Sequence, residues 1–184
     1  MIVIAFHTDD DRYNSYAERL MASIVHFRLQ HDILTIPSFG NWLRGTNYKS
    51  KFIDDMQQKY PDDDLLYVDA DSAFKQAPTL FDKPYPHDVG LFLRTPHELH
   101  AATIFLRANS NARMLVRRWR ELQDEHPGKT DQCLLQKVVN LYGKGIVDIG
   151  QLPHAYCCKF DDQCAEPVVI EQYQASRKAT SRTL

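Results

Sequence analysis

The chain has 184 residues, of which 43% are hydrophobic and 25% are charged, and its formal net charge is −2. This length suits one domain with a substantial core rather than two domains, and the composition excludes an intrinsically disordered chain. No run of residues approaches the roughly 20 apolar residues that a membrane span requires, so we expect no membrane anchor.

The first half of the sequence is predicted to alternate strands with helices. Residues 2–6 form an apolar strand, an amphipathic helix follows over about 13–30, and a short strand over 33–37 ends at Pro37. A loop begins at residues 38–42, and the next helix is predicted over about 47–60. This order is typical of an α/β sheet with helices on both faces.

A second apolar run, Leu65-Leu66-Tyr67-Val68, leads directly into Asp69-Ala70-Asp71. Residues two apart in an extended chain point to the same side, so both carboxylates can face one site. Hard cations take oxygen ligands and commonly bind through one or two carboxylates together with substrate phosphates. We therefore predict a Mn²⁺ or Mg²⁺ site at the carboxyl edge of the sheet; the alternative is an ordinary solvated turn.

The second half continues the same alternation. Strands are predicted over 88–93 and 103–106, then a helix that Ser110 or Asn111 caps and that runs to about Glu125. Thr130 is predicted to cap a helix that ends near Tyr142, residues 146–149 form a last strand, and the remainder is expected to be loop and tail. The predicted fold is therefore α/β, with a central mixed, mostly parallel sheet flanked by helices in one domain over 1–184.

Several segments in order resemble one known family. They are the Asp69-Ala70-Asp71 motif after its apolar strand, the Pro-containing turn over 77–81, and the segments 47–53, 101–109, 131–135 and 167–178. Together they resemble the nucleotide-sugar-dependent glycosyltransferases of the GT-A fold, closest to the glycogenin-like retaining type. The resemblance implies a single GT-A-like, Rossmann-like domain in which residues from about 165 onward form a tail over the donor site. It also implies transfer of a hexose from a nucleoside diphosphate sugar to a hydroxyl acceptor. UDP-sugar is the first choice of donor.

The resemblance assigns roles to particular positions. Asp131 and Gln132 would be catalytic or would orient the donor sugar, although acidic residues also stabilise the first turn of a helix. Thr8, Asp9 and Asp10, after the first strand, would hold the base and ribose; an acidic turn before a helix is the alternative.

Other positions are assigned to the diphosphate and the metal. Asp69, Ala70 and Asp71 would contact both, and Gln172 would take the third metal-ligand position, where many family members carry His. One of Lys49 and Lys51 would reach the diphosphate or the Asp pair, with Lys51 preferred. His154, Arg177 and Lys178 would contribute to the donor site, the last two as a lid over the diphosphate.

Three further side chains are candidates on their chemistry. Trp42 and Tyr48 can stack on a base or a sugar ring, although core packing is the commoner fate of such residues. His100 can bind phosphate or the acceptor, or be an ordinary histidine.

The acceptor stays open between a glycan, a lipid-linked sugar and a nucleic acid. Arginines cluster on one predicted helix, at Arg113, Arg117, Arg118 and Arg120, and the small size would suit an enzyme that glycosylates hydroxymethylated bases in viral DNA. Retention is favoured by the resemblance, whereas inversion would need a general base that no residue identifies. The oligomeric state is not predicted.

Two other functional classes use the same motif. A metal-dependent phosphohydrolase or nucleotidyltransferase would release phosphate or pyrophosphate, and a non-catalytic nucleotide-sugar binding module would bind the donor without turnover. The four cysteines show no zinc-binding spacing, which favours reduced thiols in a cytoplasmic protein over a disulfide between Cys157 or Cys158 and Cys164.

Overall fold

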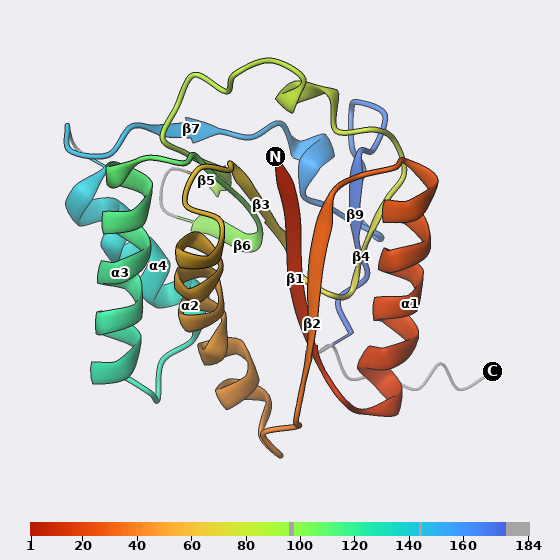
Figure 1. Cartoon of the computed structure of the whole chain (residues 1–184), viewed down its shortest axis with the longest axis horizontal. Helices are drawn as coiled ribbons and strands as arrows, with labels where there is room; N and C mark the ends of the chain where they lie inside the picture. The colour runs from red at the N-terminus through yellow and green to blue at the C-terminus, as the bar shows by residue number, and fades with distance from the viewer. Residues whose placement is uncertain (96–97, 144, 176–184) are drawn as a thin grey trace.

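The computed structural model describes residues 1–95, 98–143 and 145–175. Its main sheet has six strands in the order β2-β1-β3-β6-β5-β7 (Figure 1). The strands are β1 (Ile2–Thr8), β2 (His31–Ile36), β3 (Leu65–Val68), β5 (Val89–Thr95), β6 (Glu98–Leu106) and β7 (Ile149–Gln151). Strand β6 pairs antiparallel with both β3 and β5, whereas the other pairs are parallel, so β6 alone runs against the rest.

Helices cover both faces of this sheet. Helix α1 (Asp11–His26) lies on one face, and α2 (Trp42–Lys59), α3 (Ser110–Glu125) and α4 (Asp131–Tyr142) lie on the other (Figure 1). A small second sheet beside α1 has the order β4-β9-β8, formed by β4 (Ser72–Phe74), β9 (Ile170–Gln172) and β8 (Cys158–Lys159). Single-turn helices at Thr79–Phe81 and His154–Tyr156 complete the described elements.

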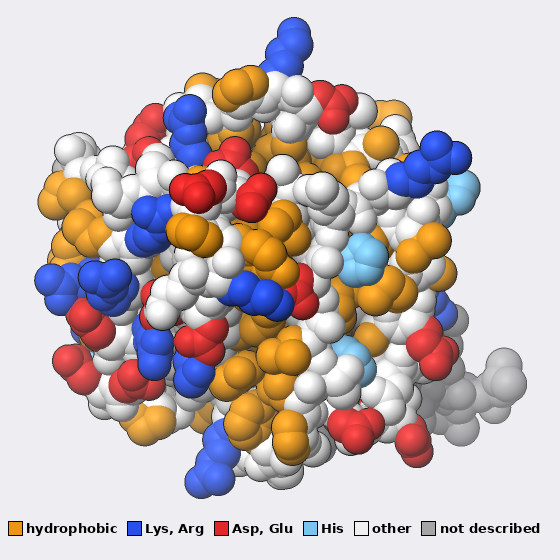
Figure 2. All heavy atoms as spheres, in the orientation of Figure 1, with side chains coloured by type: hydrophobic (Ala, Val, Ile, Leu, Met, Phe, Trp, Pro, Cys, Tyr) orange, Lys and Arg blue, Asp and Glu red, His pale blue; other side chains and the backbone are white. Residues whose placement is uncertain are grey.

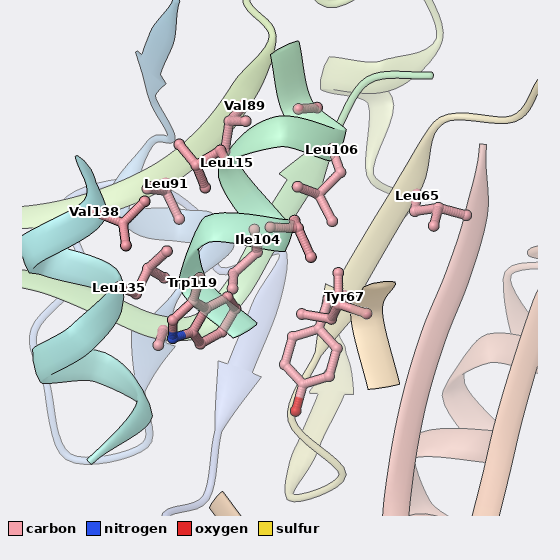
Figure 3. Close-up of a cluster of buried hydrophobic side chains, with 14 of the residues drawn as sticks. Leu65, Tyr67, Val89, Leu91, Ile104, Leu106, Leu115, Trp119, Leu135 and Val138 are labelled. Carbon is pink, nitrogen blue, oxygen red and sulfur yellow. The ribbon is translucent and has the colours of Figure 1, made fainter. Parts of the chain in front are cut away.

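The central strands are buried on both faces, as their near-continuous apolar runs require. In β3, Leu65 and Tyr67 join the core under α2, α3 and α4, while Leu66 and Val68 join the core under α1. Figure 3 shows the first of these clusters, in which Trp119 of α3 and residues of α4 pack on β5 and β6. The hydroxyl group of Tyr67 points away from that cluster.

The predicted α/β class, with its mixed and mostly parallel sheet, is confirmed, but several predictions about elements are wrong. Helix α1 ends at His26 rather than near residue 30, and α3 is capped by Asn109 rather than by Ser110 or Asn111. Helix α2 begins at Trp42 rather than near residue 47, because the Asn41 side chain accepts hydrogen bonds from the backbone N–H groups of Leu43 and Arg44 and caps the helix. The segment after residue 149 is not all loop, because it supplies β8 and β9. None of the described helices is long and apolar enough to cross a membrane.

Candidate active site

The topology brings the ends of three strands to one edge of the sheet. Strands β1 and β3 are parallel and end there, at Thr8 and Val68. Because β6 runs the other way, it begins at this edge, and the backbone N–H of Asp69 donates to the carbonyl oxygen of Ala102 at 2.9 Å. A cavity of about 700 Å³ opens here, lined also by α2 and by the first turn of α4.

Asp69 and Asp71 both line this cavity, one on each side of the buried Ala70. The Tyr67 hydroxyl donates to Asp69 Oδ1 at 2.7 Å, and the backbone N–H of Ala175 donates to Asp71 Oδ2 at 2.5 Å. Asp69 is therefore held by a residue of the strand that leads into it, and Asp71 by the last described residue of the chain.

Lys49 is the cationic centre of the cavity. Its Nζ lies 2.9 Å from Asp69 Oδ1, 2.7 Å from Asp131 Oδ2 and 3.1 Å from the carbonyl oxygen of Ala101, so three oxygens use its three protons. Burial disfavours the charge on Lys49, but Asp131 and Asp69 outweigh it and raise its pKa. The ammonium group thus links α2, β3, β6 and α4 at one point.

Asp131 is placed by its helix and by a neighbouring tryptophan. It is the first residue of α4, where Thr130 caps the helix as predicted by accepting from the backbone N–H of Cys133. The fully buried Trp119 donates its indole N–H to the Asp131 carbonyl oxygen at 3.0 Å. Gln132 also lines the cavity, beside the amino end of β6.

The cavity carries an excess of acidic groups. Of the lining residues whose side chains the structure describes, Asp10, Asp69, Asp71 and Asp131 are acidic, and Lys49 is the only lysine or arginine. Burial, reinforced by the charge on Asp69, raises the pKa of Asp71 to about 6. A buried carboxylate in this situation gains from a bound cation, so the chemistry of the pair fits a hard divalent ion.

Gln172 is close to this pair but is already bonded. Strand β9 pairs antiparallel with β4 and places Gln172 opposite Ser72. The Ser72 hydroxyl donates to Gln172 Oε1 at 2.6 Å, and Gln172 Nε2 donates to Thr103 Oγ1 at 3.0 Å. The described residues contain no group of three or more His, Cys, Asp or Glu side chains suited to a metal.

His100 lines the cavity beside the acidic centre. Burial lowers its pKa, and its Nδ1 lies 3.3 Å from the sulfur of Cys157. Burial also raises the pKa of the Cys157 thiol to about 12, so the pair is neutral. The other ring nitrogen of His100 is then the one left to meet a ligand in the cavity.

The end of β1 forms the other side of the cavity, under α1. Thr8, Asp10 and Tyr13 line it. Asp10 caps α1 by accepting from the backbone N–H of Tyr13, and it also accepts from the Thr8 hydroxyl at 2.5 Å. The helix-capping alternative therefore accounts for the Asp10 carboxylate.

Several predicted site residues lie elsewhere. Asp9 is exposed and outside the cavity lining, and Lys51 pairs with Asp55 on the outer face of α2. His154 stacks on Phe92 with ring centroids 4.9 Å apart and does not line the cavity. Arg177 and Lys178 lie outside the described residues.

Lys51 was predicted, in preference to Lys49, to reach the diphosphate or the Asp pair. The structure shows the opposite: Lys49 contacts Asp69, and Lys51 does not. With the helix start at Trp42, Lys49 lies on the same stripe as the buried residues Phe52, Ile53 and Met56, at spacings of three, four and seven. Lys51 lies off that stripe. The apolar periodicity was the sequence signal that could have identified Lys49. The predicted helix start near residue 47 instead places both lysines in the first turns, whereas the observed start at Trp42 does not.

Comparisons with known proteins find similarity in structure only. Neither a family model nor a curated protein sequence matches the chain. A glycosyltransferase involved in the glycosylation of the major capsid of PBCV-1 has a TM-score of 0.71 at 13% identity, over 94% of this chain and 92% of that chain. The galactosyltransferase LgtC, solved with donor and acceptor sugar analogs, has a TM-score of 0.59 at 12% identity, over 95% of this chain and 87% of that one.

A third solved structure, the glycosyltransferase GlyE of Streptococcus pneumoniae TIGR4, has a TM-score of 0.60 at 13% identity. The match covers 94% of this chain and 54% of GlyE. Identities this low establish the fold alone. The chain has the GT-A-like fold that the resemblance in its sequence implied, shared with these glycosyltransferases.

Proposed function

We propose that this chain is a divalent-cation-dependent glycosyltransferase that moves a hexosyl group, with retention, from a nucleoside diphosphate sugar to a hydroxyl acceptor. UDP-sugar is the donor to test first. One observation carries the proposal: within a glycosyltransferase-like fold, a single cavity gathers Asp69, Asp71 and Asp131 around Lys49. This acidic cavity needs a cation before it can take a diphosphate.

Asp69 and Asp71 would hold the cation, Mn²⁺ or Mg²⁺, with the remaining ligands coming from the donor phosphates and water. When bound, it would act as a Lewis acid and neutralise charge on the departing nucleoside diphosphate. Gln172 is not needed as a ligand in this account. Its amide holds β9 against Ser72 and Thr103 and so supports the segment that donates to Asp71.

The other residues bind and orient. Asp131 and Gln132 would accept hydrogen bonds from hydroxyls of the donor sugar, and Lys49 would fix the Asp131 carboxylate through their 2.7 Å ion pair. His100 of β6 would donate a hydrogen bond to the same sugar. Thr8 and Tyr13 lie at the side of the cavity that we assign to the nucleoside.

The acceptor is open among glycans, lipid-linked sugars and nucleic acids, but the case for DNA is weaker than the sequence suggested. Arg118 pairs with Glu121, Arg120 pairs with Asp54, and Arg113 donates to a backbone carbonyl oxygen. In Figure 2 the basic side chains over α2 and α3 lie among acidic ones. Paired arginines offer little attraction to a polyanion.

A donor panel tests the proposal. We would measure the thermal unfolding temperature with UDP-, GDP-, ADP- and CDP-sugars, with and without Mn²⁺, because a ligand that binds only the native state stabilises it. We expect a Mn²⁺-dependent rise with one donor. Asp71→Asn should abolish it, and the exposed Asp62→Asn should not.

Product analysis then separates the alternatives. Release of nucleoside diphosphate with the donor identified above supports the transferase. Release of inorganic phosphate or pyrophosphate would assign the site to a phosphohydrolase or nucleotidyltransferase, and binding without any turnover would make the chain a binding module. Absence of any donor-dependent stabilisation would remove the proposal.

A further inference from the structure

Helix α2 presents one face to the cavity along nearly two turns. Trp42, Gly45, Thr46 and Lys49 all line it, at spacings of three, four and seven residues from Trp42. A helix rises 1.5 Å per residue, so Trp42 lies about 10 Å along the axis from Lys49. The face therefore runs from the ammonium group at the acidic centre to an indole ring at the outer end of the cavity.

The indole of Trp42 is unusually free for a tryptophan. It is 53% exposed, whereas Trp119, the other tryptophan of the chain, is 1% exposed. No ring contact of Trp42 is recorded among the described residues, whereas Phe39 beside it packs on Tyr48 with ring centroids 5.5 Å apart. The exposed ring is therefore available to a ligand that enters the cavity.

Space lies beside that ring. A Cβ atom added to Gly45, or to Gly40 in the loop before the helix, would meet no heavy atom within 4 Å. Gly40 has a φ of +64°, which favours glycine and lets the loop before α2 turn tightly. The cavity is thus open on the side of Trp42 that faces Lys49.

The cavity lining around Trp42 is neutral, since Arg44 in the same turn does not line the cavity. The cavity-lining residues from the loop before α2 and from its first turn, Ser38, Phe39, Gly40, Asn41 and Trp42, carry no charge. The charged part of the cavity lies deeper and is dominated by carboxylates. A polyanion would be repelled by them, whereas an uncharged sugar would combine an apolar ring face for the indole with hydroxyls for the polar centre.

We propose that Trp42 and the adjoining face of α2 form the acceptor subsite and that the acceptor is a neutral carbohydrate, one ring of which stacks on the indole. This inference rests on the proposed function, because it assigns the second substrate of the same cavity. The ring's hydroxyl group would attack the anomeric carbon of the donor sugar. The bond from that carbon to the diphosphate breaks, the diphosphate leaves with the bonding electron pair, and the hydroxyl proton passes to a phosphate oxygen of the departing diphosphate.

The nucleoside lies on the opposite side of the cavity in this arrangement. Thr8 and Tyr13 reach the cavity from β1 and α1, and α1 and α2 cover opposite faces of the sheet (Figure 1). The two groups of residues therefore face each other across the carboxyl edge. A donor held under α1 leaves the α2 face for the acceptor.

The test is binding of the full chain to an array of immobilised neutral oligosaccharides in the presence of UDP and Mn²⁺. We expect a defined set of glycans to be bound. Trp42→Phe should retain that binding, and Trp42→Ala should weaken it by about tenfold or more, as loss of one stacked ring predicts. Phe160→Ala, which alters an aromatic residue that is 54% exposed outside the cavity, is the matched control and should change nothing.

Fluorescence gives an independent readout. Trp119 is buried in the core, so a bound glycan in free solution should change the emission of wild-type protein and leave that of Trp42→Phe unchanged. The affinity for UDP, measured by calorimetry, should be the same in wild type and Trp42→Ala.

Three results would overturn the inference while leaving the proposed function intact, provided that a nucleotide sugar still stabilises the protein. They are no binding to any neutral glycan, a loss of UDP affinity in Trp42→Ala, and Trp42-dependent binding of a single-stranded oligonucleotide. The second would assign the indole to the nucleobase, and the third would assign it to a base of a nucleic-acid acceptor. Failure of every nucleotide sugar to stabilise the protein would instead remove the proposed function itself.

Discussion

The floor and the rim of the cavity are built on opposite principles. The floor consists of Lys49, Asp69, Asp71 and Asp131, which are mostly buried and tied to partners by distances of 2.5–2.9 Å. The rim consists of Trp42 and its neighbours at the start of α2, where the indole is 53% exposed. Buried charges are costly unless each is paired, so the floor tolerates little change, whereas the rim can vary to suit a substrate without cost to the fold.

Removing Lys49 should give the largest effect. Lys49→Met leaves two carboxylates at the floor without their shared cation, and breaking a buried pair costs about 3–5 kcal/mol. Urea unfolding at pH 7 should show this loss in the free energy of unfolding. Lys51→Met, two residues away on the exposed face, should cost less than about 0.5 kcal/mol because it removes only a surface pair with Asp55. Equal costs for the two variants would mean that the floor is not held by Lys49.

In the absence of a bound cation, replacing Asp71 with a neutral residue should stabilise the protein. The pKa of Asp71 is raised from 3.8 to about 6 in the folded chain, so the native state binds this proton more tightly than the unfolded state does. Ionisation of Asp71 therefore lowers the free energy of unfolding. This loss develops as the pH rises from about 4 to about 6 and reaches its full value, about 2–3 kcal/mol, above that.

Asp71→Asn should therefore be stabler than wild type at pH 7 in a chelator, and the difference should vanish at pH 4, as measured by urea unfolding across this range. Saturating Mn²⁺ should stabilise wild type and not the variant. A variant that is less stable than wild type at every pH would show that the acid is needed for its hydrogen bond to Ala175 rather than strained by burial.

The neutral pair at the edge of the floor should have an intermediate effect. Cys157→Ala removes a fully buried sulfur and leaves His100 Nδ1 without that partner, which should cost about 1–2 kcal/mol in the free energy of unfolding. Cys133→Ala, at an exposed position on α4, is the control and should cost almost nothing. A negligible cost for both would indicate that the contact with His100 is not maintained in solution.

The sequence predicted most of the floor because local patterns encode it. Asp69 and Asp71 follow a fully apolar strand, and Thr130 before Asp131 marks a helix start. Lys49 was not preferred because the helix was predicted to begin near residue 47, which placed both lysines at its start. The observed start at Trp42 puts Lys49 inside the helix, on its buried face.

Contacts between residues far apart in the sequence could not be predicted from local sequence patterns. Gln172 was predicted near the metal, and β9 does return beside β4, but the hydrogen bonds of its amide to Ser72 and Thr103 join residues 100 and 69 positions apart. Strands of two or three residues such as β8 and β9 carry no periodicity of their own and form only when the rest of the sheet presents an edge.

The rim shows the same limit for aromatic residues. Trp42 and Tyr48 were equal candidates for stacking, yet Tyr48 packs between Phe6 and Phe39, with ring centroids 5.2 and 5.5 Å away, and only Trp42 lines the cavity. The two residues lie six positions apart on the helix, which is enough to turn one ring toward its aromatic neighbours and the other toward the cavity.

The smallest predicted effect is the one that defines the rim. Trp42→Ala should change the free energy of unfolding by less than about 0.5 kcal/mol, since surface substitutions away from packed features usually do. Trp119→Ala, the matched change in the core, should cost about 3–5 kcal/mol, because it opens a cavity and leaves the Asp131 carbonyl oxygen without its indole donor. If Trp42→Ala instead destabilised the protein by more than about 1 kcal/mol, the indole would be part of the packing of α2. The rim would then be part of the packed structure, like the floor, and Trp42 could not be regarded as a residue that is free to contact a substrate.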